Sequence, residues 1–400
     1  MIKIFRFMTM STISLPVLCL AVICAVPVWA RQIPSQPQVL SNAVVNQPIH
    51  FDVSPPLAEL VREAPAQQGV RLLHAPMKPK MQQLTGAQGS RVAAAAGAVE
   101  PFTAGPISAT IGLSFEGVGN TSFLNCPKVA LQEVAPPDTN AAVGDTQVVE
   151  WVNTCYAVFD KSSGNLISGP FSGTNFWAGF GAPCETNNDG DIIIQWDKTN
   201  HRWLAAQNVF AGPPFYTCVA VSQTADALGT YSRYTFPQSG FPDYPKWGLK
   251  PNVYYQSQND FGPEGNSFLG VNVCAYQANL MRKGNSNAAQ VCILDNSDGT
   301  LFDDSMLPAD DDTANGPDGP EVYLGAIDNF LPGDTHVYEL VFTVDFSNPA
   351  SSTLAGVNGS MPISVPAFNL AFCLSGPFLT TDCVSLSRAQ RLNWTRLAID

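Results

Sequence analysis

Apolar and polar side chains alternate with a period of two through most of the chain from about residue 105 onward. The first such run is Ile107 to Ile111, and similar runs continue to the C-terminus, separated by Gly, Pro, Asn and Asp. Short period-two runs bounded by turn residues are typical of β-strands joined by tight turns. Residues 105–400 are therefore predicted to form an all-β domain.

Residues 31–104 have a different pattern. They contain proline-rich pieces such as PSQPQ and a run of alanines from Ala93 to Ala96, and they lack a hydrophobic period. A short amphipathic helix is expected around Leu57 to Glu63. The rest of this region is predicted to be a low-order leader or linker.

Residues 1–30 have the three parts of a secretory signal peptide. Lys3 and Arg6 supply the positive end, Ile13 to Val26 is apolar, and Ala30 ends a small-residue cleavage site. A transmembrane helix is the alternative, but the apolar run is short for a span and contains a proline. We expect cleavage, a secreted or cell-surface location, and no membrane span in the mature protein.

An acidic motif recurs along the predicted β-domain. Asp138, Asp189 and Asp243 follow one another at intervals of 51 and 54 residues, each close to a strand-like run. Four short strands with their turns need about 45–50 residues, which is the size of one β-propeller blade. The interval favours a β-propeller over a β-sandwich, whose strands need no such regular motif.

About five blades are visible in the sequence. The fourth is expected to begin near Glu321 and the fifth near Arg391, and the chain then stops within a strand-like run, 397–400. Because a propeller closes its ring or leaves an open edge, either Ile107 to Phe115 completes the last blade or further blades follow in a longer protein.

Composition narrows the classes of function. Charged residues are only 13% of the chain, and Gly 31 with Pro 32 indicate many turns, which disfavours helical bundles. The net charge of −13 argues against a nucleic-acid partner, because phosphate binding needs clustered Lys and Arg.

Eight cysteines remain after the signal peptide, and an even number in a secreted chain indicates disulfides. Pairing of neighbours along the chain would bridge adjacent strands of one sheet, and it is preferred among the 105 possible arrangements. The predicted pairs are Cys126–Cys155, Cys184–Cys218, Cys274–Cys292 and Cys373–Cys383. A catalytic thiol is the functional alternative.

Three long motifs resemble a known set of proteins. PPDTNAAVGDTQVVEWVNTCYAVFD, CETNNDGDIII and FPDYPKWGL are similar to segments of large secreted bacterial proteins whose shared portion is interpreted as a sialidase-like β-propeller. The resemblance covers roughly residues 112–400. It implies secretion and a propeller fold, and it implies no catalytic residues.

In a propeller, residues at the starts of the innermost strands meet around the central channel, where a ligand can bind. Three roles are considered for them. As a glycoside hydrolase, which needs two carboxyl groups, the protein would use Asp138, Asp189 and Asp243, with Glu185 or Glu321 as proton donor. As a ligand-binding protein, it would use Asn140, Tyr244, Lys246 and Arg391. The alternative for each acidic residue is a turn-forming role.

The run Asn187 to Asp191 also resembles a calcium loop, because Asn187, Asp189 and Asp191 offer closely spaced oxygen ligands. The complete EF-hand pattern is missing. Calcium is therefore the one candidate cofactor.

Aromatic side chains offer stacking faces for sugar rings. Trp177 and Phe180 lie in the glycine-rich run SGTNFWAGFGAP and are predicted to form an exposed aromatic lip. The preferred hypothesis is a secreted propeller that binds an extracellular carbohydrate or other surface polymer without cleaving it. A glycoside hydrolase and a non-catalytic adhesin or scaffold are the alternatives.

Overall fold

The computed structural model describes residues 38–63, 112–118, 138–265, 267–296, 306–309, 319–325, 334–357 and 362–368. The signal peptide, most of residues 64–137 and Arg391 lie outside these ranges. So do Cys126, Cys373 and Cys383.

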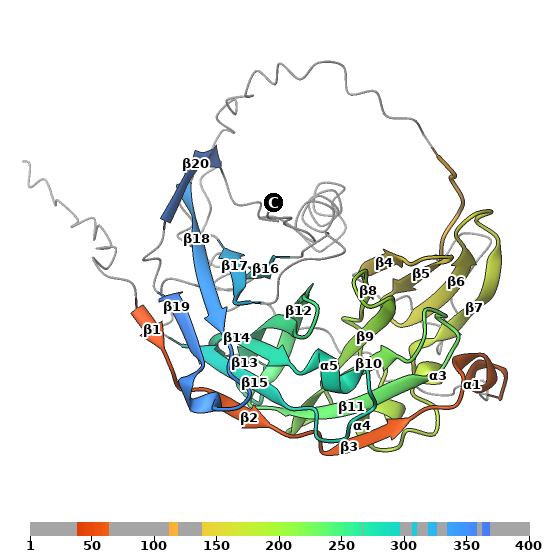
Figure 1. Ribbon diagram of the computed structural model, residues 1–400, viewed down its shortest axis with the longest axis horizontal. Coiled ribbons are helices and arrows are strands. Elements are labelled where there is room, and N and C mark those ends of the chain that lie inside the picture. Colours follow the sequence, from red (N-terminus) through yellow and green to blue (C-terminus); the bar gives the residue numbers. More distant parts are fainter. Residues whose placement is uncertain are drawn as a thin grey trace, which may run out of the picture. The chain divides into compact units, whose positions relative to one another are not determined.

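Four antiparallel sheets follow one another along the chain, as the sequence predicted for an all-β protein (Figure 1). Sheet 1 contains β4 (Thr139–Val143), β5 (Gln147–Val152), β6 (Cys155–Asp160) and β7 (Leu166–Ser172). Sheet 2 contains β8 (Ile193–Asp197), β9 (Arg202–Val209), β10 (Phe215–Ser222) and β11 (Tyr231–Gln238). In both sheets each strand pairs with the next one in sequence.

The third and fourth sheets continue this order. Sheet 3 contains β12 (Phe241–Leu249), β13 (Tyr254–Phe261), β14 (Phe268–Tyr276) and β15 (Gln290–Asp295). Sheet 4 contains β16 (Leu307–Pro308), β17 (Glu321–Gly325), β18 (Asp334–Thr343), β19 (Thr353–Val357) and β20 (Pro362–Phe368). The first strands are neighbours, since β4 contacts β8, β8 contacts β12, and β12 contacts β16.

Each sheet packs face to face on the next one, because its strands are apolar on both sides. On β9, Trp203 and Ala205 belong to the cluster shared with sheet 1, whereas Leu204 and Ala206 belong to the cluster shared with sheet 3. A third cluster joins sheet 3 to sheet 4. This period-two division places the core in the seams between successive sheets.

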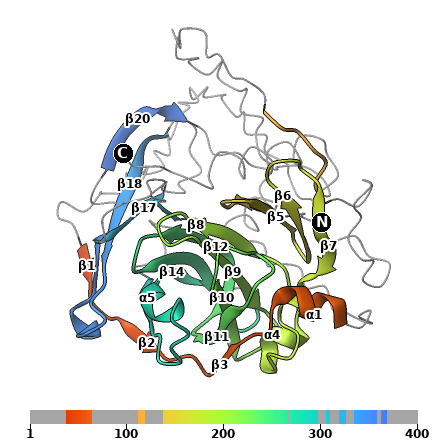
Figure 2. The same cartoon turned by 45° about the vertical axis from the view of Figure 1, so that its right-hand side comes forward.

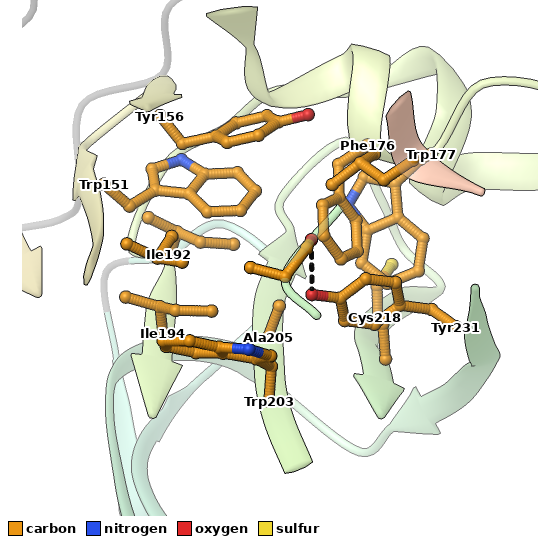
Figure 3. Packing of buried hydrophobic residues seen from close by; sticks show 14 of the residues in the cluster. Trp151, Tyr156, Phe176, Trp177, Ile192, Ile194, Trp203, Ala205, Cys218 and Tyr231 are labelled. Carbon is orange, nitrogen blue, oxygen red and sulfur yellow. Dashed lines mark hydrogen bonds between the residues drawn. The ribbon is translucent and has the colours of Figure 1, made fainter. Parts of the chain in front are cut away.

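The seam between sheets 1 and 2 is rich in aromatic rings (Figure 3). Trp151 stacks on Tyr156 with ring centroids 4.5 Å apart, and Phe176 meets Tyr231 edge to face at 4.8 Å. Such aromatic pairs contribute about 0.5–1.5 kcal/mol beyond the area that they bury.

The N-terminal segment (residues 38–63) differs from the low-order leader that the sequence predicted. Its strands β1 (Gln38–Leu40), β2 (Val44–Asn46) and β3 (His50–Val53) add to sheets 4, 3 and 2 respectively. They pair with β19, β15 and β11, each at the edge of its sheet (Figures 1 and 2). The prediction of low order is therefore wrong for 38–53, because pairing partners about 180 to 320 residues away supply the backbone hydrogen bonds.

A helix and two disulfides agree with the sequence predictions. Helix α1 spans Leu57–Glu63, and Leu57 is buried in the seam between sheets 1 and 2. Cys184 is bonded to Cys218, and Cys274 to Cys292 on the neighbouring strand. Cys155 is also disulfide-bonded, while its predicted partner and the predicted pair Cys373–Cys383 lie outside the described residues.

Candidate functional site

The first two acidic motifs are linked through Asn153, at the turn between β5 and β6. The Asn153 Nδ2 donates to Asp138 Oδ2 at 2.8 Å. A side chain placed at Gly190 would collide with the same Asn153 amide. Asp138, Asn153 and Asp191 all have positive φ angles, a conformation that Asn and Asp adopt more readily than most residues. The motif residues thus shape the tight backbone before β4 and β8.

The second and third motifs are linked through two phenylalanines. The backbone amide of Phe210 donates to Asp189 Oδ2 at 2.8 Å. The Phe210 ring stacks on Phe241, with centroids 4.7 Å apart, and Phe241 is two residues before Asp243. The structure therefore brings the three predicted acidic segments next to one another in succession.

Two other predicted site residues, Glu185 and Asn140, also accept hydrogen bonds from the backbone. Glu185 accepts hydrogen bonds from the amides of Gly179 and Gly181, at 2.9 and 2.7 Å. Asn140 Oδ1 accepts from the amide of Ile194 at 2.8 Å, which ties β4 to β8. These contacts favour the turn-forming and strand-linking role over a role in ligand binding.

The third motif forms a β-bulge rather than a turn before the strand. The register of β12 against β13 shifts between Asp243 and Lys246, and Tyr244 has a positive φ. Lys246 Nζ lies over the Tyr244 ring at 3.3 Å and donates to the Pro245 carbonyl at 3.1 Å. Asp243 is buried. The third acidic residue therefore lies at a bulge within its sheet, and not in a turn that precedes the sheet.

Two predictions for the site residues are wrong. Trp177 and Phe180 are buried, not exposed, because helices α3 (Gly173–Phe176) and α4 (Ala182–Thr186) fold the glycine-rich run onto the core. Glu321 starts β17, the second strand of sheet 4, and its side chain is fully buried. It therefore does not precede a first strand as Asp138 and Asp189 do.

The candidate calcium loop uses its side chains within the protein. Asn187 Nδ2 donates to the Pro183 carbonyl at 2.7 Å, and the Asn187 carbonyl accepts from Gln207 Nε2 at 3.1 Å. No group of three His, Cys, Asp or Glu side chains in the described part of the chain is arranged to hold a metal ion. Calcium binding at Asn187, Asp189 and Asp191 stays a prediction.

A different set of polar residues crosses the interior of sheet 3, beginning at the N-terminal segment. Asn46 Nδ2 donates to Gln290 Oε1 at 2.8 Å. Gln290 Nε2 donates to the Tyr276 hydroxyl at 2.7 Å, and that hydroxyl donates to Gln256 Oε1. All but Asn46 are buried, and burial raises the pKa of Tyr276 well above its usual value, so this phenol stays neutral.

The same chain of hydrogen bonds ends at the buried carboxyl of Asp260. Gln256 Nε2 donates to Gln258 Oε1 at 2.9 Å, and Gln258 Nε2 donates to Asp260 Oδ1 at 2.7 Å. Asp260 Oδ2 accepts from Asn272 Nδ2 at 2.9 Å and from Ser239 Oγ at 3.2 Å. Burial raises the pKa of Asp260 to about 7, although these three donors act to lower it.

A pocket of about 180 Å³ lies beside this network, between β2, the end of β11, and strands β14 and β15. Its polar lining comes from Asn46, Gln238, Ser239 and Asn272, and its apolar lining includes Pro237 and Leu294. Within the described residues, Gln238 Nε2 and Asn272 Oδ1 have no hydrogen-bond partner although both are buried. A buried donor and a buried acceptor without a partner cost free energy.

Sequence reasoning did not identify this pocket. Its two residues from β2 precede the other lining residues by about 190 to 250 positions in the chain, and none of these segments carries a known motif. One local signal exists, since the run Gln256 to Asp260 puts five consecutive polar residues in a strand whose every residue is buried.

Comparisons with known proteins give the following findings. No known protein family and no curated protein matches the sequence. Among solved structures, this chain is similar to a family GH43 endo-arabinanase from Bacillus licheniformis, with 11% identity, 57% of this chain and 78% of that chain covered, and a TM-score of 0.29. It is also similar to a candidate glycosidase from Bacteroides thetaiotaomicron, with 14% identity, coverage of 59% and 74%, and a TM-score of 0.29. No helix in the described ranges is long and apolar enough to cross a membrane.

Proposed function

We propose that this protein is a secreted β-propeller protein that binds an extracellular carbohydrate, without cleaving it, in the pocket between β2, β11, β14 and β15. The observation that carries the proposal is the lining of this pocket by four residues with amide or hydroxyl side chains, Asn46, Gln238, Ser239 and Asn272. A sugar hydroxyl both donates and accepts, so it can pair with side chains of either kind. Pro237 and Leu294 offer apolar surface for the C–H face of a sugar ring.

The size of the pocket sets the part of a glycan that it accepts. Drug-sized ligands occupy pockets of about 300–1,000 Å³, and this pocket has a volume of about 180 Å³. It suits one sugar ring at the end or side of a longer polymer.

Binding is favoured over hydrolysis by the distribution of carboxyl groups. A glycoside hydrolase places two of them on either side of the scissile bond. The described lining of the pocket contains no carboxyl group, and Asp260 lies behind Ser239 and Asn272. At the acidic motifs, Asp189 and Glu185 accept hydrogen bonds from backbone amides.

A panel of polysaccharides and glycoproteins, assayed for binding and for released sugar, tests this proposal. We expect binding without release, and Gln238→Ala and Asn272→Ala should each weaken it at least tenfold. Gln207→Ala is the matched control, because it truncates a buried glutamine that bonds Asn187 outside the pocket.

Other outcomes would replace the proposal. Released sugar that Asp138→Asn, Asp189→Asn or Asp243→Asn abolishes would establish a hydrolase at the acidic motifs. If neither binding nor released sugar is detected for any member of the panel, the scaffold or adhesin would be favoured.

A further inference from the structure

The two disulfides that the structure describes join different kinds of elements. Cys184 in α4 is bonded to Cys218 on β10, so this bond holds a helix against a sheet. Cys274 and Cys292 lie directly opposite each other on β14 and β15, two strands that are paired along their length. Because backbone hydrogen bonds already hold these strands together, opening the second disulfide leaves sheet 3 in place.

Cys274 and Cys292 project from the face of sheet 3 that packs on sheet 2. Both belong to the cluster between these two sheets, whereas Ile293, the next residue of β15, belongs to the cluster shared with sheet 4. Successive side chains of a strand point to opposite faces. Asn272 and Leu294 therefore share the face of the disulfide, and they line the pocket together with Cys292.

The pocket gives the solvent a path to one side of this disulfide. Two of its lining residues are exposed, Val44 at 56% and Ser239. Cys292 is 5% exposed, whereas the other three cysteines of the two described disulfides are 0% exposed. A small molecule in the pocket thus approaches the disulfide from the Cys292 side.

We propose that Cys292 is the site at which a small neutral thiol exchanges with the Cys274–Cys292 disulfide and becomes covalently bound to the protein. The thiol is small because the pocket has a volume of about 180 Å³. It is neutral because the described lining has amide, hydroxyl and apolar side chains and no charged one, and an unpaired charge is costly to bury. The inference goes beyond the proposed carbohydrate function and does not rest on it.

The exchange is a displacement at sulfur. The thiolate of the added thiol attacks Cys292 Sγ and forms a new S–S bond with it, and the bond between Cys292 Sγ and Cys274 Sγ breaks. The electron pair of that bond leaves with Cys274, which takes up the proton that the added thiol released. The products are a mixed disulfide at Cys292 and a thiol at Cys274, and no further oxidant or reductant is consumed.

The test uses the whole folded protein, purified without reductant, and 2-mercaptoethanol as the thiol. Samples are quenched over time, free thiols are alkylated, and the modified cysteines are located by mass spectrometry of unreduced peptides. We expect the mercaptoethanol adduct on Cys292 and the alkyl group on Cys274. Both should form roughly ten times faster than any product of Cys184–Cys218, since the rate of exchange depends on access to sulfur.

Two tryptophan variants on β2 test whether the thiol enters through the pocket. Val44 pairs with Cys292 and lines the pocket, so Val44→Trp should narrow it and slow adduct formation severalfold. Val45→Trp is the matched control, because Val45 is the next residue of the strand, is 45% exposed and lies outside the described lining. It should react at the wild-type rate.

Several results would overturn the proposal. They are an adduct on Cys274 in place of Cys292, equal reactivity of the two disulfides, equal rates for the two tryptophan variants, and the absence of any adduct in the folded protein. A rate that rises in sub-denaturing urea in parallel with unfolding would also overturn it, because the thiol would then be reacting with the unfolded chain. A failure to bind any sugar of the panel would contradict the carbohydrate function and leave this inference unaffected.

Discussion

The N-terminal segment (residues 38–63) is attached to sheet 2 by an ion pair and to sheet 3 by a hydrogen bond between neutral side chains. Strand β3 is tied to sheet 2 by charge, since Arg233 donates from Nε and Nη2 to the two oxygens of Asp52 at 2.9 and 2.6 Å. Strand β2 is tied to sheet 3 by neutral amides, through Asn46 and Gln290. The first attachment is an ion pair, and the second belongs to a network of hydrogen bonds between neutral side chains that ends at Asp260.

The difference follows from what surrounds each contact. Arg233 is only 1% exposed, and it also donates to the carbonyls of Phe176 and Ala178. A buried guanidinium carries its charge at every relevant pH and requires acceptors. The network at β2 ends instead at Asp260, whose charge can change near neutral pH. One short segment is thus attached to one sheet by an ion pair and to the next by a hydrogen-bond network that contains a titratable carboxyl group.

Asp52→Ala should give the largest loss of stability. It leaves the buried Arg233 with two carbonyl acceptors and without its counter-ion, and breaking a buried pair in this way costs about 3–5 kcal/mol. Because the Asp52 side chain is 28% exposed and water can replace part of it, we expect about 3 kcal/mol in urea unfolding. Asp52→Asn, which keeps one acceptor, should lose less; a loss below about 1 kcal/mol for the alanine variant would show that the attachment is an ordinary surface pair.

Asp260 should make stability depend on pH in the direction opposite to most carboxyl groups. Its pKa is about 7 in the folded protein and near the ordinary 3.8 when unfolded. Its contribution is therefore fully present below pH 3.8 and is lost as the pH rises through 7. Compared with Asp260→Asn, the wild type should gain up to about 1.4 kcal/mol per pH unit as the pH falls between these values.

This pH effect is measured as a difference between the two proteins in urea unfolding. Asp160 and Asp345, whose pKa values serine and backbone donors lower to about 2, are common to both and cancel. Parallel stability curves for wild type and Asp260→Asn from pH 4 to 8 would contradict a buried carboxyl.

Asn46→Ala should have the smallest effect. It removes the donor to Gln290 Oε1 and to the Pro237 carbonyl, and a neutral hydrogen bond contributes about 1 kcal/mol. Val45→Ala, on the same strand and 45% exposed, is the control. A loss for Asn46→Ala as large as that for Asp52→Ala would remove the distinction between the two attachments.

Local patterns in the sequence predicted much of the fold. The period-two runs predicted an all-β domain, and the proximity of Cys274 and Cys292 along the chain predicted their pairing. The helix at Leu57–Glu63 was predicted from its apolar spacing. These features depend on neighbours in sequence, which is the information that a pattern contains.

The features that were missed depend on distant partners. Val39, Val44 and Val53 are more than half exposed, so strands β1 to β3 show no division into a buried and a solvent face. Their pairing with β19, β15 and β11 defines them. Trp177 was misplaced for a similar reason, because a glycine-rich run indicates a loop but does not show what the loop packs against.

The candidate site was predicted only in part. The acidic motifs do adjoin, as Asn153 and Phe210 show, yet the oxygens of Asp189 and Glu185 hold backbone amides. The pocket was not predicted, because Asn46, Gln238 and Asn272 are ordinary residues until three strands place them together.

The reversed order of β1, β2 and β3 along sheets 4, 3 and 2 has a consequence for how the protein matures. These strands leave the ribosome before any of their partners exist, and Asn46 must wait for a residue 244 positions later. Sheets built from neighbouring hairpins close over short loops, whereas such distant pairing is slow. This segment is thus made before its partners and paired after them, and until then the wall that it gives to the pocket is missing.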